Sequence, residues 1–221
     1  MKLDVALLGG TGRYGMGLAA RCAGAHRVYI GSRTYEKAKA ACQRIGSMLG
    51  RGPETSSPLP RENYDALKEA EIVVICIPYE QAISTVRTLI GAFEDQIVIS
   101  PLSPLVRAGD LYTYLTPREG SAAMQLYQML PEGVEVVSAL QNVPASKLLD
   151  LERPLAYDVP VFADSGSARK KVFELIREIK FLRPVYGGPL ELSALGEMLG
   201  ALWRNVGKLN KMDDPSLKFV E

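Results

Sequence analysis

Residues 3–15 read Leu3-Asp4-Val5-Ala6-Leu7-Leu8-Gly9-Gly10-Thr11-Gly12-Arg13-Tyr14-Gly15, an apolar run that leads directly into a glycine-rich turn. A helical segment and a second apolar run, 27–30, follow it. The spacing Gly10-x-Gly12-x-x-Gly15 between a strand and a helix is typical of a dinucleotide-binding loop, because it lets a pyrophosphate approach backbone N–H groups at the helix N-terminus. We therefore predict a nucleotide site here; a tight turn without a ligand is the alternative.

The end of the second apolar run bears on which dinucleotide binds. In NAD-binding versions of the loop, an Asp or Glu about 20 residues further on accepts a hydrogen bond from the ribose 2′-hydroxyl. This chain has Ser32 and Arg33 there, with Lys37 one helical turn beyond. A carboxylate would repel a 2′-phosphate, whereas a hydroxyl and a guanidinium can hold it by charge-assisted hydrogen bonds. The sequence predicts NADP; a solvated arginine at a strand end is the alternative.

Composition excludes several other classes of function. Lys and Arg number 26 against 25 Asp and Glu, so no bulk charge indicates nucleic acid or membrane as a partner. Cys22, Cys42 and Cys76 show no CxxC spacing, and we interpret Cys22 and Cys76 as buried thiols of a reducing compartment. His26 is the only histidine and is interpreted as a packing residue, which argues against a metal cluster or a hydrolase triad. With no signal peptide and no apolar run of bilayer length, we expect a cytoplasmic protein.

The rest of the chain alternates between apolar runs and segments with helical periodicity. This alternation predicts a Rossmann-type α/β fold, with a doubly wound and mostly parallel sheet. The continuous apolar run 72–77 is typical of a central strand, and residues 51–61 are interpreted as a loop. Further strands are expected at 96–100, 134–140, 159–162 and 183–186, and helices at 35–49, 79–93, 121–130, 167–180 and 189–211. We expect an NADP-binding domain at 1–150 and a small carboxyl-terminal domain at 151–221 that closes the cofactor cleft.

The last expected helix carries a broad apolar face. We expect this face to pack in the core, with packing against a second copy of the chain as the alternative. Gly196-x-x-x-Gly200 would permit close approach of another element, and the charges of Glu197, Arg204 and Lys208 exclude a membrane span. The residues of the face are Leu195, Met198, Leu199, Leu202, Trp203, Val206 and Leu209.

Several of the expected strands are followed by proline at their carboxyl ends, at Pro78, Pro101 and Pro144. In doubly wound sheets ligands bind at these ends. Rigid prolines suit the walls around a flat ring system. Tyr79 and Gln81, just past the central strand, could pack on such a ring and hydrogen-bond to it.

Short stretches along the whole chain resemble one family in the same order and at similar spacings. They are 5–12, 30–33, Ile77-Pro78 with an aromatic next, 100–104, 138–140, 158–160, 182–184 and 218–219. On these stretches the chain resembles the NADPH-dependent reductases of coenzyme F-420 (F420), the 8-hydroxy-5-deazaflavin:NADP oxidoreductases. The resemblance implies a Rossmann domain with a small carboxyl-terminal domain, and a deazaflavin that lies against the nicotinamide in the cleft between them.

The resemblance also implies roles for particular residues. Where the family commonly reads Ser-Ala-Leu-His-x-x-Pro, with a histidine that contacts the deazaflavin, this chain has Gln141, whose amide can donate a neutral hydrogen bond. Gln141 and the backbone of 143–145 are the candidates for orienting the second ring. The residues that would hold NADP are Thr11, Gly12, Arg13, Tyr14, Ser32, Arg33 and Lys37, and those that would line the nicotinamide and deazaflavin are Ile77, Gln81, Val143 and Ala145.

Hydride transfer between two stacked rings depends on their positioning rather than on an acid, a base or a nucleophile. We therefore assign no side chain a catalytic proton-transfer role. Two alternatives remain: an NADP-dependent reductase of an ordinary flavin or a small carbonyl or imine substrate, and a non-catalytic NADP-sensing protein. The expected partners are small-molecule cofactors and, in a homodimer or higher homo-oligomer, further copies of the chain, without nucleic acid, membrane or metal.

Overall fold

The structure is a computed structural model that describes residues 2–50, 58–215 and 217–220. The chain forms two compact units that are interleaved along the sequence. The first comprises Met1–Val98, Pro131–Val134 and Ala145–Arg153, and the second Ile99–Leu130, Glu135–Pro144 and Pro154–Glu221. The predicted boundary at residue 150 does not coincide with this division, and the roles assigned to the two domains stay predictions.

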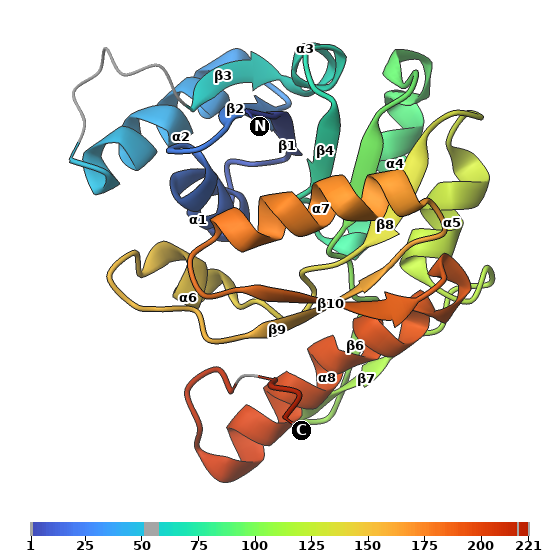
Figure 1. Cartoon of the computed structure of the whole chain (residues 1–221). Helices are drawn as coiled ribbons and strands as arrows, with labels where there is room; N and C mark the ends of the chain where they lie inside the picture. The colour runs from blue at the N-terminus through green and yellow to red at the C-terminus, as the bar shows by residue number, and fades with distance from the viewer. Residues whose placement is uncertain (1, 51–57, 216, 221) are drawn as a thin grey trace. The chain divides into compact units, whose positions relative to one another are not determined.

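The first unit contains a parallel sheet with the strand order β4-β1-β2-β3. Every residue of β4 is buried and so is β1 after Asp4, as expected of strands covered on both faces. The strands are β1 (Asp4–Leu8), β2 (Arg27–Ser32), β3 (Leu59–Glu62) and β4 (Ile72–Ile75), and the helices are α1 (Arg13–Cys22), α2 (Tyr35–Met48), α3 (Asn63–Lys68), α4 (Tyr79–Thr88), η1 (Ile90–Ala92) and α6 (Ala145–Leu149). The β1-α1-β2 unit predicted around the glycine loop is confirmed (Figure 1).

Strand β5 (Ile97–Ser100) begins in the first unit and ends in the second. In the second unit the strand order is β10-β9-β8-β5, with β9 and β10 parallel and β8 and β9 antiparallel. Its other elements are β8 (Glu135–Ser138), β9 (Asp158–Phe162), β10 (Arg183–Gly188), α5 (Ala122–Met129), α7 (Gly166–Glu178), η2 (Leu190–Leu192) and α8 (Ser193–Asn210). The eight strands make one mostly parallel sheet, so the predicted fold class is confirmed.

Four short features were not predicted: β3, α3, α6 and a hairpin formed by β6 (Leu105–Ala108) and β7 (Leu111–Tyr114). β3 contains Pro60, which a sheet tolerates in an edge strand. The loop predicted at 51–61 is therefore wrong for its last part, and residues 51–57 lie outside the described residues. The hairpin turns through Gly109-Asp110, a pair suited to two-residue turns.

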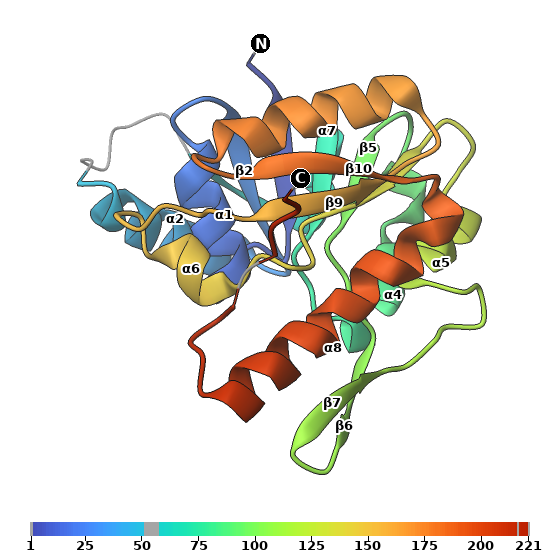
Figure 2. The ribbon, with the colours of Figure 1, turned by 60° about the horizontal axis from the view of Figure 1, so that its bottom comes forward.

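The prediction for the apolar face of the last helix is wrong. α8 buries its small residues, whereas Leu195, Leu202 and Leu209 are 58%, 49% and 68% exposed. The reason is close packing on the inner side: a Cβ added at Gly196 would lie 2.6 Å from the Phe162 ring. Large side chains do not fit there, so they face outward. Figure 2 shows α8 beside the β6–β7 hairpin, with which it makes extensive contact.

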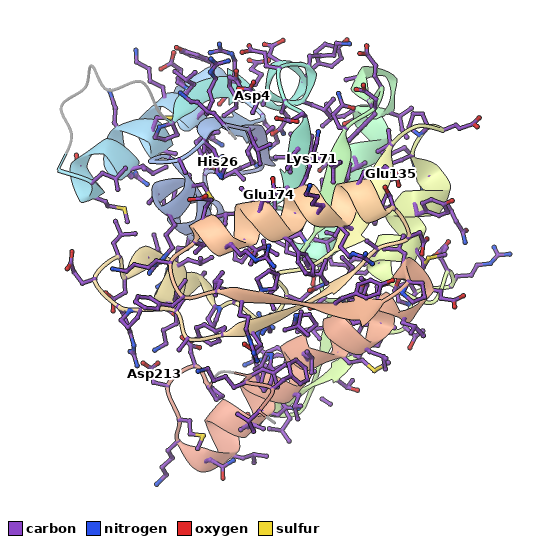
Figure 3. The ribbon with its side chains drawn as sticks, in the orientation of Figure 1. Asp4, His26, Glu135, Lys171, Glu174 and Asp213 are labelled. Atoms are coloured by element: carbon purple, nitrogen blue, oxygen red, sulfur yellow. The ribbon has the colours of Figure 1, made fainter. Side chains whose placement is uncertain are left out.

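The predictions for the histidine and the cysteines have mixed outcomes. His26, labelled in Figure 3, is buried, and its Nδ1 accepts a hydrogen bond from the Leu3 N–H at 3.3 Å, as expected of a packing residue. Cys22 is buried, but Cys76 lies just past β4 and is only half-buried. Burial raises the pKa of the Cys76 thiol, and it raises that of Cys42 to about 12. In the described part of the chain, no helix is both long and apolar enough to cross a membrane.

Candidate nucleotide and ring site

The glycine loop is held in a tight turn by backbone contacts. The Gly10 N–H donates to the carbonyls of Leu7 and Gly31, both at 3.0 Å, which ties the loop to the ends of β1 and β2. A Cβ at Gly15 would lie 2.5 Å from the Gly10 Cα, so α1 can start this close to β1 only with glycine there. The side chain of Asn63 supports the turn from α3, because its Oδ1 accepts from the Gly9 N–H at 3.1 Å.

The outer side of the loop is open. Gly12 is the N-cap of α1, and a Cβ built on it would meet no described atom within 4 Å. The first turn of α1 contains no acidic residue and no side chain caps it. A helix N-terminus of this kind presents N–H groups and a positive dipole end to an anion. This opening fits the pyrophosphate of a dinucleotide.

Tyr14 belongs to the loop and is half-buried, with its phenol near the thiols of Cys76 and Cys22. Burial raises the pKa of Tyr14, and the neighbouring thiols of Cys76 and Cys22 raise it further. The phenol therefore stays neutral and lies near the end of β4. The part of Tyr14 best placed to meet a phosphate is its backbone N–H in the first turn of α1.

The end of β2 carries the residues predicted to select the nucleotide. Ser32 is the last residue of β2 and is buried, whereas Arg33 and Lys37 are exposed, the latter in the first turn of α2. Thr34 is the N-cap of α2. Two cations at the N-terminal end of a helix make a favourable environment for a phosphate group.

Strand β3 adds a carboxylate that sequence reasoning missed. Glu62 is in register with Ser32 on the neighbouring strand, and its side chain is exposed. The arginine beside it, Arg61, is already engaged: its Nη2 donates to Glu69 Oε2 at 3.2 Å, and its guanidinium lies 5.6 Å from the centre of the Tyr29 ring. This pairing raises the pKa of Arg61 and lowers that of Glu69. Glu62 could not be found from the sequence because its strand was interpreted as a loop.

Ile77 and Gln81 follow β4, at the same end of the sheet as the glycine loop. The Cγ1 of Ile77 lies 2.4 Å from where a Cβ of Gly9 would be, so Ile77 lies directly against the loop. Gln81 is exposed in the first turn of α4, for which Pro78 is the N-cap. The structure therefore brings Ile77 to the nucleotide loop and leaves the Gln81 side chain accessible.

In the second unit, Gln141 is fixed at the ends of two strands. Its Nε2 donates to the Ser100 carbonyl at 3.2 Å, at the end of β5, and to Ser138 Oγ, at the end of β8. Both hydrogens of the amide nitrogen are then used. In this conformation Gln141 offers a ligand its oxygen as an acceptor, and not the donor that the sequence suggested.

Backbone strain lies next to Gln141. Leu140 is buried and has φ +72°, a left-handed conformation that is uncommon for a residue other than glycine. Strained residues of this kind gather at functional sites. Among the described residues, the buried Oγ of Ser100 at the end of β5 is one of the side-chain atoms with no hydrogen-bond partner.

Val143 and Ala145 follow Gln141 into helix α6. Val143 is buried and Ala145 half-buried as the first residue of α6. Arg21 of α1 holds this helix by its last turn, because its Nη2 donates to the carbonyl oxygens of Lys147 at 2.9 Å and Asp150 at 2.6 Å. The end of α6 is thereby fixed to α1, which belongs to the same unit.

Three of the family-like stretches meet in a second polar centre. Arg183 binds Asp158 through Nε at 2.7 Å and Nη2 at 2.6 Å, and the Phe219 N–H donates to Asp158 Oδ2 at 2.5 Å. Arg183 also donates to the Phe219 carbonyl at 2.7 Å. A cavity of about 380 Å³ lies here, lined by Ala156, Asp158, Phe181, Arg183, Lys218, Phe219 and Val220. We call the three residues Asp158, Arg183 and Phe219 the C-terminal clamp.

A parallel sheet with an open glycine loop at a helix N-terminus and two cations after the second strand defines a Rossmann-type dinucleotide-binding protein. The profile of a family described as "NADP oxidoreductase coenzyme F420-dependent" matches residues 4–104. The F420-dependent NADP reductase of Methanocaldococcus jannaschii is 37% identical over 202 residues, which cover 90% of each chain. That of Methanothermobacter thermautotrophicus is 31% identical over 224 residues, covering 100% of this chain and 96% of the relative. The chain belongs to the family of F420-dependent NADP reductases.

Solved structures agree with the fold. A crystal structure from Arthrobacter sp. FB24, provisionally named an F420-dependent NADP-reductase, has a TM-score of 0.81 at 23% identity and covers 99% of this chain and 100% of its own. A reductive aminase from Aspergillus terreus, solved with NADPH, has a TM-score of 0.64 at 14% identity, covering 96% of this chain and 64% of its own. At these identities the likeness concerns the fold alone.

Proposed function

We propose that this chain transfers a hydride between NADP(H) and the deazaflavin coenzyme F420. The observation that carries the proposal is the similarity to F420-dependent NADP reductases over nearly the full length of both chains. The open glycine loop and the cations after β2 are the features that a reductase of this class needs for its nucleotide.

The first unit would bind NADP. Backbone N–H groups of Thr11, Gly12, Arg13 and Tyr14 would meet the pyrophosphate, since they surround the N-terminus of α1. The 2′-phosphate would lie against Ser32, Arg33 and Lys37, with Glu62 as a nearby repulsive group. Gly10 and Gly15 act by keeping the turn tight.

The residues proposed to contact the two rings are Ile77, Gln81, Gln141, Val143 and Ala145. Gln141 would accept a hydrogen bond from a ring N–H, because its own donors are used by Ser100 and Ser138. Ile77, pressed on the glycine loop, would form an apolar wall for the nicotinamide.

With both coenzymes bound, NADPH would supply a hydride, with its electron pair, to the deazaflavin, and solvent would supply the proton that completes the reduction. The protein's part is to hold the two rings in contact and to exclude water from between them. The strained Leu140 and the anchored helix α6 serve this purpose, since both fix the segment that contains Gln141, Val143 and Ala145. No side chain is proposed to transfer a proton.

We propose further that the enzyme works in the cytoplasm, acts on small molecules without nucleic acid, and forms a homo-oligomer. The near-equal numbers of basic and acidic residues support the absence of nucleic acid, and the exposed apolar face of α8 supports self-association. The earlier alternatives, an ordinary flavin or carbonyl substrate and a sensor without turnover, are not favoured by the named relatives.

The test is to mix purified protein with NADPH and oxidised F420 and to follow the bleaching of the deazaflavin, with FMN and FAD measured in parallel. We expect rapid bleaching of F420 and much slower reduction of the two flavins. Equal rates with FMN, or an inert deazaflavin, would overturn the proposal in favour of another electron acceptor.

Gln141→His and Gln141→Ala then probe the ring site. The histidine variant restores the residue common in the family, and we expect it to keep or increase the rate with F420. The alanine variant should raise KM for F420 and leave the Kd for NADPH unchanged. A change in the Kd for NADPH alone would remove Gln141 from the deazaflavin site.

A further inference from the structure

Asn63 is a buried polar residue at the nucleotide end of the first unit. It is the first residue of α3 and follows β3 directly. Since β1, β2 and β3 are parallel, Asn63 lies at the same edge of the sheet as the glycine loop. It is only 6% exposed. A polar group without a partner is costly at such a place, so the partners of its amide oxygen and nitrogen decide what Asn63 does.

The oxygen of the amide binds the glycine loop. Asn63 Oδ1 accepts a hydrogen bond from the Gly9 N–H at 3.1 Å. The side chain reaches Gly9, which follows β1, by crossing the end of β2, since a Cβ built on Gly31 would lie 2.8 Å from Asn63 Oδ1. Glycine at position 31 therefore leaves the space that the amide occupies. Because an N–H group needs an acceptor, the contact with Gly9 also fixes which end of the amide faces the loop.

The nitrogen of the amide is left without a partner. Within the part of the chain that the structure describes, Asn63 Nδ2 donates no hydrogen bond to another residue. The amide lies against Gly31, one residue before Ser32, where a Rossmann fold passes the ribose of the adenosine half. A buried donor at this place, with its oxygen already engaged, fits a neutral acceptor on that ribose.

We propose that Asn63 holds the adenosine ribose of NADP(H), with Nδ2 donating to the 3′-hydroxyl oxygen while Oδ1 keeps the glycine loop in place. The inference rests on the proposed function, because it names a further contact for the same nucleotide. The 2′-phosphate is the less suitable acceptor, since burying its charge would be costly and the exposed Arg33 and Lys37 offer it cations. One side chain thus fixes both the loop that meets the pyrophosphate and the ribose next to it.

The role of Asn63 differs from that of Arg33 in what it recognises. The 3′-hydroxyl is common to NADPH and NADH, whereas the 2′-phosphate belongs to NADPH alone. Asn63→Ala should therefore lower the affinity for the two nucleotides by the same factor. A contact through the loop alone would give the same result, so the decisive experiment changes the ligand as well as the protein.

That experiment measures the Kd of NADPH and of 3′-deoxy-NADPH, which lacks the 3′-hydroxyl of its adenosine, for the wild type and for Asn63→Ala. We expect the wild type to bind NADPH roughly 2- to 10-fold more tightly than the analogue, as one neutral hydrogen bond implies. Asn63→Ala should bind both more weakly and no longer distinguish them. Tyr64→Phe, at the next position of α3 and 52% exposed, is the matched control and should keep the wild-type preference.

Unchanged circular dichroism and Tm show that Asn63→Ala is folded. Asn63→Leu, whose side chain has nearly the same shape as the amide, replaces it if the alanine variant is unstable. Equal affinity of the wild type for NADPH and the analogue, or the same preference in the wild type and the variant, would overturn the proposal and leave Asn63 as a support of the loop alone. A wild type that binds neither nucleotide would overturn the proposed function as well.

Discussion

Arg33 and Lys37 are both exposed beside the buried Ser32, at the place where a Rossmann fold passes the adenine ribose. Of the two, Arg33 is adjacent to the strand end, and its planar guanidinium can bind a phosphate through two hydrogen bonds at once. A hydrogen bond to a charged group contributes about 1.5–3 kcal/mol. Replacing Arg33 by alanine should therefore lower the affinity for NADPH by roughly 10- to 150-fold.

The measurement is a titration of NADPH and NADH into the wild type and Arg33→Ala. NADH has no 2′-phosphate, so its affinity should scarcely change. Arg44→Ala, an exposed arginine later in α2, is the control and should affect neither nucleotide. An equal loss for both nucleotides with Arg33→Ala would show that Arg33 does not bind the phosphate.

For Glu62 we predict the opposite effect: its substitution should raise the affinity for NADPH. Its register position beside Ser32 places an exposed carboxylate near the proposed 2′-phosphate. Repulsion between exposed like charges at this range is about 1 kcal/mol. Glu62→Gln should therefore raise the affinity for NADPH by roughly 2- to 10-fold in the same titration. If the affinity for NADH rises as much as that for NADPH, the carboxylate does not act on the 2′-phosphate.

At the scale of elements, Glu197 joins α8 to α5. Its carboxylate is buried and accepts hydrogen bonds from the Ala122 N–H at 2.9 Å, the Ala123 N–H at 3.0 Å and the Tyr114 hydroxyl at 2.8 Å. One residue of α8 thus caps the N-terminus of α5 and anchors β7. Ser121 adds to the cap from its own side, since its Oγ accepts from the Met124 N–H at 3.0 Å.

Glu197→Ala should lower the free energy of unfolding by about 3 kcal/mol, because two buried N–H groups and the half-buried Tyr114 hydroxyl lose their acceptor. Glu197→Gln should lower the free energy of unfolding less at neutral pH, since the amide oxygen still accepts hydrogen bonds. Burial raises the pKa of Glu197. The folded state therefore favours the protonated form, and the stability of the wild type relative to Glu197→Gln should fall as the pH rises above the ordinary value of about 4.3. Urea denaturation at pH 4 and pH 7 measures both effects; an alanine variant as stable as the wild type would contradict the capping role.

The same elements show what the sequence could and could not reveal. β1, β4 and β5 were predictable because strands buried on both faces are continuous apolar runs. The periodicity of α8 correctly predicted an amphipathic helix, but it could not tell which face points inward. The close contact of Gly196 with Phe162 involves a residue far away in sequence. The prediction of β3 as a loop was wrong for a related reason, since only its pairing with β2 makes this segment a strand.

At the scale of the whole molecule, the nucleotide end of the candidate site follows from one local motif, whereas the rest depends on distant contacts. The glycine loop and Ser32-Arg33 could be found by spacing alone. The support of the loop by Asn63 and the fixing of α6 by Arg21 could not, because they join residues 54 and 126 or more positions apart. The C-terminal clamp was visible only as three separate family-like stretches.

The C-terminal clamp joins β9, β10 and the last described residues, so it should contribute to the stability of the second unit at low pH in particular. Arg183 lowers the pKa of Asp158, and the Phe219 N–H adds to the effect. A lowered pKa means that the folded state favours the carboxylate. Its contribution is fully present above the ordinary Asp value of about 3.9 and is lost as the pH falls through the lowered value. This dependence is opposite in sign to that of Glu197.

We therefore predict that Asp158→Asn lowers the free energy of unfolding by about 1–2 kcal/mol at pH 7, because hydrogen bonds to a charged group are lost while the Arg183 side chain is 59% exposed and partly screened by water. The loss should be smaller at pH 3, where part of the wild-type contribution has already gone. Arg183→Gln should show the same pH dependence. The double variant should lose little more free energy of unfolding than either single variant, because the two residues act through one contact. Digestion with a carboxypeptidase provides a second readout. Both single variants should release the chain end faster than the wild type, since its anchor at Phe219 is lost. Additive losses in the double variant, or a loss that is equal at pH 3 and pH 7, would show that the ion pair does not hold the chain end.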